Sequence, residues 1–285
     1  IAWQIHSGRP ICGEGRVTSG SCGTRCGWIH KLRNIRLIAR LDVKAPNLVK
    51  GIQFEGLRKL GDPNFFAKKY YNDGVDEIYY EDIVASLYER NSLVDIVEKT
   101  TEEIFVPVTV GGGLRHVDDV AAVLRAGADK VSINTEAIKR PQIIQEVSDR
   151  FGSQCLVLSI QAKQQGDRWE AYFDNGRERS GVDVLEWVEY GETSGAGEIL
   201  LTSVDREGTS RGFDLSLTKA VTERVEIPVI ASGGMGCDKD LIDVVKVGGV
   251  DAVAMAHVLH YEKCHLRNLR EKCRAERIPV RVTDC

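Results

Sequence analysis

The sequence predicts an α/β protein, a (β/α)8 TIM barrel whose two halves are internal repeats. The segment Val106–Leu114 returns in the second half as Ile227–Met235, and each copy precedes an amphipathic stretch and a second apolar run, Ala128–Thr135 or Val250–His257. From Ile35 onward, short apolar runs alternate with amphipathic stretches. A repeat this long is half a domain rather than a solenoid unit, and eight strand–helix units in about 250 residues fit a barrel.

Eight segments are predicted as barrel strands because they are nearly continuous apolar runs, as expected for strands covered on both faces. In chain order they are Arg36–Val43, Glu77–Ile83, Pro107–Val110, Lys130–Ile133, Cys155–Ile160, Glu198–Thr202, Pro228–Ala231 and Ala252–Ala256. Amphipathic helices are predicted at Val117–Ala126, Pro141–Phe151, Leu215–Arg224 and Asp238–Val247. A doubly wound open sheet uses similar elements, but its halves do not normally repeat so regularly. The alternation within the insertion Gln164–Arg179 predicts a small hairpin over the barrel mouth.

Composition narrows the class of protein. Hydrophobic residues make up 42% of the chain and charged residues 28%, enough for a full core and a hydrated surface. The formal net charge of -4 gives no electrostatic case for binding nucleic acid or an anionic membrane. No apolar run approaches the ~20 residues that span a bilayer. The eight scattered cysteines show no disulfide framework, which favours a reducing, cytoplasmic location.

Residues 1–34 differ from the rest of the chain. They are rich in Gly, Ser, Arg and Cys and lack both apolar periodicity and the apolar core of a signal peptide. We expect a leader that is disordered or not native to the functional protein, followed by a barrel domain over residues 35–285. Cys22, Cys26 and His30 have spacings that metal ligands can have, but no fourth ligand is evident, so no metal site is predicted.

The carboxyl ends of the strands are where barrel enzymes place their chemistry. Asp42 ends the first predicted strand. A carboxylate there is well placed to act as a general base, with burial expected to raise its pKa toward neutrality. A structural carboxylate that accepts hydrogen bonds from loop donors is the alternative.

Turns at the same ends, with glycines among them, form two candidate phosphate cradles, because a glycine lets backbone N–H groups approach an anion closely. The first cradle comprises Gly113, Asn134 and Thr135. The second comprises Gly208, Gly234, Ala256 and His257. Two related cradles in matched halves predict a ligand with a phosphate at each end.

Several motifs match one known family. They include Leu41–Lys44, Ala128–Thr135 and Gly195–Ser203, and the match runs from Arg36 to about Arg281. On these motifs the sequence resembles the cyclase subunits of imidazole glycerol phosphate synthase, within the histidine-biosynthesis barrel family.

The resemblance implies an ammonia-dependent synthase subunit that uses no cofactor and acts on a phosphorylated small molecule in histidine biosynthesis. It also implies a heterodimer with a separate glutaminase subunit, which docks on the N-terminal face of the barrel and releases ammonia into the barrel core. Asp129 matches a family position that faces the glutaminase.

Four charged residues each open a predicted strand and should therefore meet at the bottom of the barrel. They are Arg36, Glu77, Lys130 and Glu198. The resemblance implies that this ring is the family's ammonia gate. An ion-pair layer that only seals the barrel is the structural alternative.

The catalytic set that the resemblance implies is Asp42, Gln161, Thr202 and Lys50. The family has a second catalytic aspartate where this chain has Gln161, and an amide can hydrogen-bond but cannot give up a proton as a carboxylic acid does. Lys50 and Thr202 are expected to orient the substrate. Glu207 replaces a shorter acid beside the second cradle, and Arg40 replaces a small residue before the Leu-Asp pair.

These departures leave three hypotheses for function. The first is the histidine-pathway cyclase. The second is a relative that uses ammonia to amidate a nucleotide sugar for surface polysaccharide. The third is a non-catalytic activator of a glutaminase, which has no need of Asp42, Lys50 or the two cradles.

Overall fold

The predicted barrel is confirmed by a computed structural model, which describes residues 33–85 and 93–282. In the described residues, eight parallel strands close on themselves, each paired with the next and the last paired with the first. They are β1 (Arg36–Lys44), β4 (Glu77–Asp82), β5 (Val108–Gly111), β6 (Lys130–Ile133), β7 (Leu156–Gln165), β10 (Glu198–Ser203), β11 (Val229–Ser232) and β12 (Ala252–Met255). The barrel closes at the seam where β12 pairs with β1, and an isolated bridge between Ile35 and Val280 adds to this seam. The segment 1–34, with Cys22, Cys26 and His30, lies outside the described residues apart from its last two positions.

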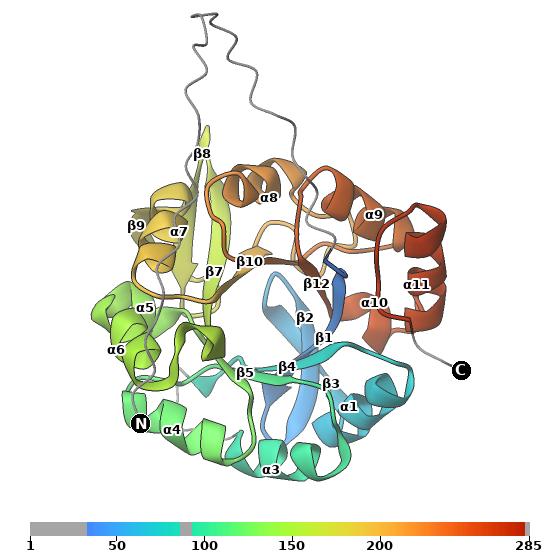
Figure 1. Ribbon diagram of the computed structural model, residues 1–285, viewed down its shortest axis with the longest axis horizontal. Coiled ribbons are helices and arrows are strands. Elements are labelled where there is room, and N and C mark those ends of the chain that lie inside the picture. The colour runs from blue at the N-terminus through green and yellow to red at the C-terminus, as the bar shows by residue number, and fades with distance from the viewer. Residues whose placement is uncertain (1–32, 86–92, 283–285) are drawn as a thin grey trace, which may run out of the picture. The chain divides into compact units, whose positions relative to one another are not determined.

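Helices surround the strands on the outside of the barrel (Figure 1). The larger ones are α1 (Pro63–Asn72), α3 (Val94–Glu103), α4 (Val117–Arg125), α6 (Gln142–Phe151), α7 (Val184–Thr193), α8 (Leu215–Thr222), α9 (Asp238–Lys246) and α11 (Leu266–Ala275). The four predicted helices are confirmed, with ends shifted by no more than two residues. Asp62, Asp183 and Asp214 begin α1, α7 and α8 by accepting backbone N–H groups of the first turn. None of the helices in the described ranges is long and apolar enough to cross a membrane.

The half-barrel repeat is visible in two short helices. α5 (Thr135–Lys139) directly follows β6, and α10 (His257–His260) directly follows β12, so each half ends a strand at the mouth and turns at once into a helix. A short turn (η1, Ser153–Cys155) leads into β7.

Two hairpins rise from the carboxyl ends of the strands. The predicted one is confirmed, because β7 continues beyond the barrel and pairs antiparallel with β8 (Arg168–Phe173), which pairs with β9 (Glu178–Asp183). The other, β2 (Asn47–Ile52) with β3 (Glu55–Gly61), was not predicted. Its sequence shows little apolar alternation, since much of β3 is charged and solvent-exposed.

Side chains that point inward form layers along the barrel axis, because successive residues of a strand face opposite sides. The N-terminal layer holds the predicted charge ring. The middle layer is an apolar cluster made by Ile38, Tyr79, Val157, Leu200, Ile230, Ala252 and Ala254. The layer at the mouth is polar and includes Arg40, Asp42, Gln161, Thr202 and Ser232, all buried. The outward-facing side chains pack under the helices as the main core.

Candidate active site

Asp42 lies at the centre of a buried ion-pair network at the barrel mouth. One carboxylate oxygen accepts a hydrogen bond from Arg40 Nε at 2.9 Å, and the other accepts one from Lys50 Nζ at 2.8 Å. The Arg40 guanidinium also donates to Thr202 Oγ1 at 3.2 Å and to Ser232 Oγ at 3.1 Å. The structure thus joins three residues of the predicted catalytic set, with Arg40 linking Asp42 to Thr202.

The expected pKa of Asp42 was wrong. Burial by itself raises the pKa of this carboxyl, but the charges and hydrogen bonds of Lys50 and Arg40 outweigh burial and hold the pKa well below its usual range. Asp42 is therefore ionised at neutral pH and is a weak proton acceptor. The sequence places Arg40 two residues before Asp42, on the same face of β1, and that spacing was the available signal for the pairing.

Two aromatic rings lie close to the Arg40 guanidinium. Its guanidinium carbon lies 5.6 Å from the ring centre of Phe54, in the β2–β3 turn, and 5.7 Å from that of Tyr79 on β4. These distances are in the range of cation–π attraction. The unpredicted hairpin thus contributes a wall of the site through Phe54, which is buried.

Lys50 joins the network to Glu207. The Lys50 ammonium contacts the Glu207 carboxylate as well as Asp42. Burial lowers the pKa of the Lys50 ammonium. The charges of Asp42 and Glu207 raise this pKa by more, so that it lies above its usual value. A Cβ on Gly208 would lie 2.7 Å from the carbonyl oxygen of Gly51 on β2, so this glycine lets the segment that carries Glu207 pack against β2.

The other members of the second predicted cradle follow β11 and β12 at the barrel mouth. A Cβ on Gly234 would lie 2.3 Å from the carbonyl oxygen of Gly212, so close backbone packing requires glycine there. Ala256 caps α10 and His257 begins it. Burial and then the charges of Lys263 and Lys50 lower the pKa of His257, which favours the neutral ring at pH 7. That these residues hold a phosphate stays a prediction.

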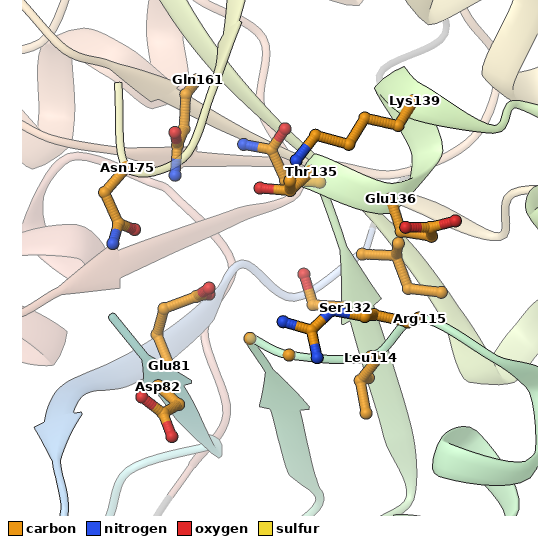
Figure 2. Close-up of a pocket in the computed structure, with 14 residues that line it drawn as sticks. Glu81, Asp82, Leu114, Arg115, Ser132, Thr135, Glu136, Lys139, Gln161 and Asn175 are labelled. Atoms are coloured by element: carbon orange, nitrogen blue, oxygen red, sulfur yellow. The ribbon is translucent and has the colours of Figure 1, made fainter. Parts of the chain in front are cut away.

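The first predicted cradle lines a cavity at the mouth (Figure 2). Gly113, Asn134 and Thr135 all lie on it, as their positions in sequence suggested. The full lining is Glu81, Asp82, Gly112, Gly113, Leu114, Arg115, Ser132, Ile133, Asn134, Thr135, Glu136, Lys139, Gln161 and Asn175. The sequence interpretation missed the cations Arg115 and Lys139, which add positive charge beside the cradle in a lining that also holds the carboxyl groups of Glu81, Asp82 and Glu136.

Gln161 connects this cavity to the predicted hairpin. Its side-chain oxygen accepts a hydrogen bond from the backbone N–H of Gly176 at 2.7 Å. The neighbouring Asn175 lines the cavity and contacts the carbonyl oxygen of Ile83 through its amide nitrogen. The β8–β9 turn therefore covers part of the cavity, and Gln161 helps to hold it there.

Glu81 is the main residue that the sequence interpretation missed. It lies opposite Asp42 in the β1–β4 register and is only 8% exposed, yet it lines the cavity. The Tyr79 hydroxyl donates to its carboxylate and lies 3.1 Å from Ser132 Oγ. Burial raises the pKa of Glu81 to about 7, although the charge of Arg40 and the bond from Tyr79 oppose the rise. Counting every second residue from Glu77 along the strand would have found it.

We expect Glu81 to make the stability of the protein depend on pH. The folded state binds the Glu81 proton more tightly than the unfolded chain does. The resulting contribution to the free energy of unfolding is complete below about pH 4.5 and is lost as the pH rises through about 7. Glu81→Gln should remove this loss, which amounts to about 3 kcal/mol. Urea unfolding of both proteins at pH 5 and pH 8 measures it, and an equal pH dependence in the two proteins would contradict the prediction.

The four residues predicted to meet at the bottom of the barrel do so. Arg36 lies 2.9 Å from both Glu77 and Glu198, and Lys130 lies 3.0 Å from both. Thr109 also donates to Glu77, at 2.6 Å. Cations and anions thus alternate around the ring, and the apolar middle layer separates it from the Asp42 network.

Asp129 adjoins the ring and has a bond within the chain. Its carboxylate accepts the backbone N–H of Val108 at 2.8 Å. Asp251 does the same for Val229 at 3.1 Å in the other half of the barrel. This bond gives Asp129 a structural role within the chain. Its contact with a glutaminase stays a prediction.

Comparison with known proteins decides the family. A family model described as "Histidine biosynthesis protein" matches residues 36–265. The chain belongs to this family. The match covers all eight barrel strands and all the candidate cradle residues.

Three similar proteins carry the same name, imidazole glycerol phosphate synthase subunit HisF. The Legionella pneumophila protein is 60% identical over 206 residues, which cover 72% of this chain and 97% of that protein. The Methanococcus maripaludis protein is 43% identical and the Pyrococcus furiosus protein 47%, each covered over 98% of its length. The match covers 86% and 87% of this chain, respectively. None of these names favours the sugar-amidating or the non-catalytic alternative.

Proposed function

We propose that the chain is the cyclase subunit of an imidazole glycerol phosphate synthase, a lyase-type enzyme that uses ammonia on a phosphorylated substrate in histidine biosynthesis. The observation that carries the proposal is the buried Asp42–Lys50 network beside a cavity lined by Gly113, Asn134 and Thr135. The similarity to the three relatives over nearly their whole lengths supports the same function. The scattered cysteines support a cytoplasmic location.

The substrate is bound through its phosphates at the two cradles. One phosphate lies against Gly113, Asn134 and Thr135, where Arg115 and Lys139 add positive charge. The other lies at the second set, Gly208, Gly234, Ala256 and His257, next to Glu207 and Lys50. Two separated anion sites fix both ends of an extended substrate and so place its centre over Asp42.

The Asp42 network stabilises charge at the reacting centre. When ammonia adds to carbon, its nitrogen becomes positively charged, and the fixed negative charge of Asp42 favours that state. Lys50 and Thr202 orient the substrate, and Gln161 positions it by hydrogen bonding while it holds the β8–β9 turn. Because Asp42 is firmly ionised by Arg40 and Lys50, its part is electrostatic more than proton-accepting.

Ammonia enters from the opposite end of the barrel. A glutaminase subunit docks on the N-terminal face, with Asp129 at the contact, and delivers ammonia to the ring of Arg36, Glu77, Lys130 and Glu198. The apolar layer above the ring suits neutral ammonia better than ammonium, since burying an unpaired charge is costly.

An assay with free ammonia tests the function without the partner. The purified chain is mixed with an ammonium salt and the histidine-pathway bisphosphate substrate across pH 6–9, and loss of substrate is followed by absorbance. We expect turnover that saturates with the bisphosphate. No turnover by folded protein that binds the bisphosphate would contradict the proposed function.

A further inference from the structure

The site lacks one acid where the resemblance requires it. Condensing ammonia with a carbon that bears oxygen forms a C–N bond and breaks a C–O bond, and the oxygen must be protonated to leave as water. Gln161 cannot donate that proton and become an anion. Asp42 is held ionised by Arg40 and Lys50. A proton donor has to come from elsewhere in the cavity.

Glu81 is the carboxyl group that fits this need. Figure 2 shows Glu81 and Gln161 both directed toward the interior of the cavity, from β4 and β7. Glu81 is the register partner of Asp42 on β1 and lines the same cavity as Gln161, which stands at the position of the missing acid. The Tyr79 hydroxyl fixes the orientation of the Glu81 carboxyl.

The charges around Glu81 let it exchange a proton near neutral pH. Arg40 and Asp42 face it from β1, Tyr79 and Asp82 share its strand, and across the cavity lie Arg115, Glu136 and Lys139. Burial is the largest influence and favours the protonated form. A group with a pKa close to the working pH is the most effective acid–base catalyst.

We propose that Glu81 is the catalytic proton donor of this site and replaces, from β4, the carboxyl group that Gln161 lacks on β7. The inference rests on the proposed function. As ammonia and an oxygen-bearing carbon condense, the nitrogen loses two protons and the oxygen gains two. In each half of the exchange Glu81 gives one proton to the oxygen and recovers one from the nitrogen, directly or through water, so that it ends protonated as it began.

The test is Glu81→Gln in the ammonia assay, measured on the full chain across pH 6–9. Glutamine keeps the shape and still accepts the bond from Tyr79, but it cannot transfer a proton. We expect kcat to fall by about 10²-fold or more, with KM little changed, as for a group that acts only in the transition state. In the wild type, kcat should fall as Glu81 loses its proton above about pH 7, and this limb should vanish in the variant.

Two further variants separate catalysis from structure. Glu81→Gln combined with Gln161→Asp moves the carboxyl across the cavity and should recover part of the lost kcat. Glu189→Gln is the matched control, because Glu189 pairs with Arg224 at 2.8 Å on the surface and does not line the cavity. Its kcat and pH profile should match the wild type.

The possible failures are distinguishable. If Glu81→Gln keeps the wild-type kcat and its pH limb while the wild type turns over substrate, the role of Glu81 is refuted and the proposed function stands. If the wild type itself gives no turnover, the proposed function is refuted, and the role of Glu81 in that reaction falls with it.

Discussion

Asp42→Asn is expected to reduce ammonia-dependent turnover by about 10²-fold or more and to lower the free energy of unfolding by about 3–5 kcal/mol. Asparagine removes the negative charge that both Arg40 and Lys50 contact, and all three side chains are buried. Glu207 remains as an anionic partner for Lys50, but Arg40 keeps only neutral acceptors, the substituted amide oxygen and the hydroxyls of Thr202 and Ser232. An unpaired buried guanidinium is costly.

Two measurements check this prediction. Urea unfolding gives the loss of stability, and the ammonia assay, run without urea at a temperature where the variant is folded, gives the loss of turnover. Asp118→Asn is the matched control, because the Asp118 side chain is 89% exposed and its ion pair with Arg150 should contribute less than about 1 kcal/mol. Wild-type stability in Asp42→Asn would show that the network does not depend on this charge. Wild-type turnover would remove Asp42 from its role in the reaction.

Glu77→Gln is expected to lower the free energy of unfolding by about 3–5 kcal/mol. Glu77 is 2% exposed and bonds to Arg36, Lys130 and Thr109. Without its charge, the two partly buried cations share Glu198 alone, and the ring carries one uncompensated positive charge. Removal of one partner of a buried ion pair is far more costly than removal of an exposed one.

Thermal and urea unfolding measure this effect, with Glu103→Gln as the matched control. Glu103 pairs with Lys68 at 2.8 Å, but both side chains are more than half exposed, so its loss should cost less than about 1 kcal/mol. Equal stabilities for the two variants would mean that the ring is solvated in solution and that its charges are not held by burial.

The barrel and its charge ring could be predicted because they follow from periodic patterns. Each barrel strand is an apolar run long enough to be recognised alone, and the repeat of Val106–Leu114 as Ile227–Met235 fixes two strands in matching places. The ring followed because Arg36 and Glu198 stand at strand starts, where parallel strands of a barrel bring their first residues together.

The ion pairs and pKa values at the barrel mouth could not be predicted from periodic patterns. The pKa of Asp42 depends on whether Arg40 folds back onto it or reaches into solvent, and this is decided by Phe54 and Tyr79 packing on the guanidinium. Phe54 comes from a hairpin that has little apolar alternation in its sequence. Glu81 was missed because it stands inside a segment predicted as a strand, and its inward direction is found only when the two-residue period is applied from Glu77.

The seam where the barrel closes has a consequence for folding kinetics. β1 pairs with β12, and Ile35 with Val280, so these contacts join segments at opposite ends of the barrel sequence. Closing so long a loop costs chain entropy that no local contact repays in advance. The strand pairs within each half-barrel can form early. The pairing of β1 with β12 then forms late, and until it does both strands are exposed edges. We therefore expect refolding of this protein to be slow, although its strands are apolar. We also expect association during refolding to increase at high protein concentration.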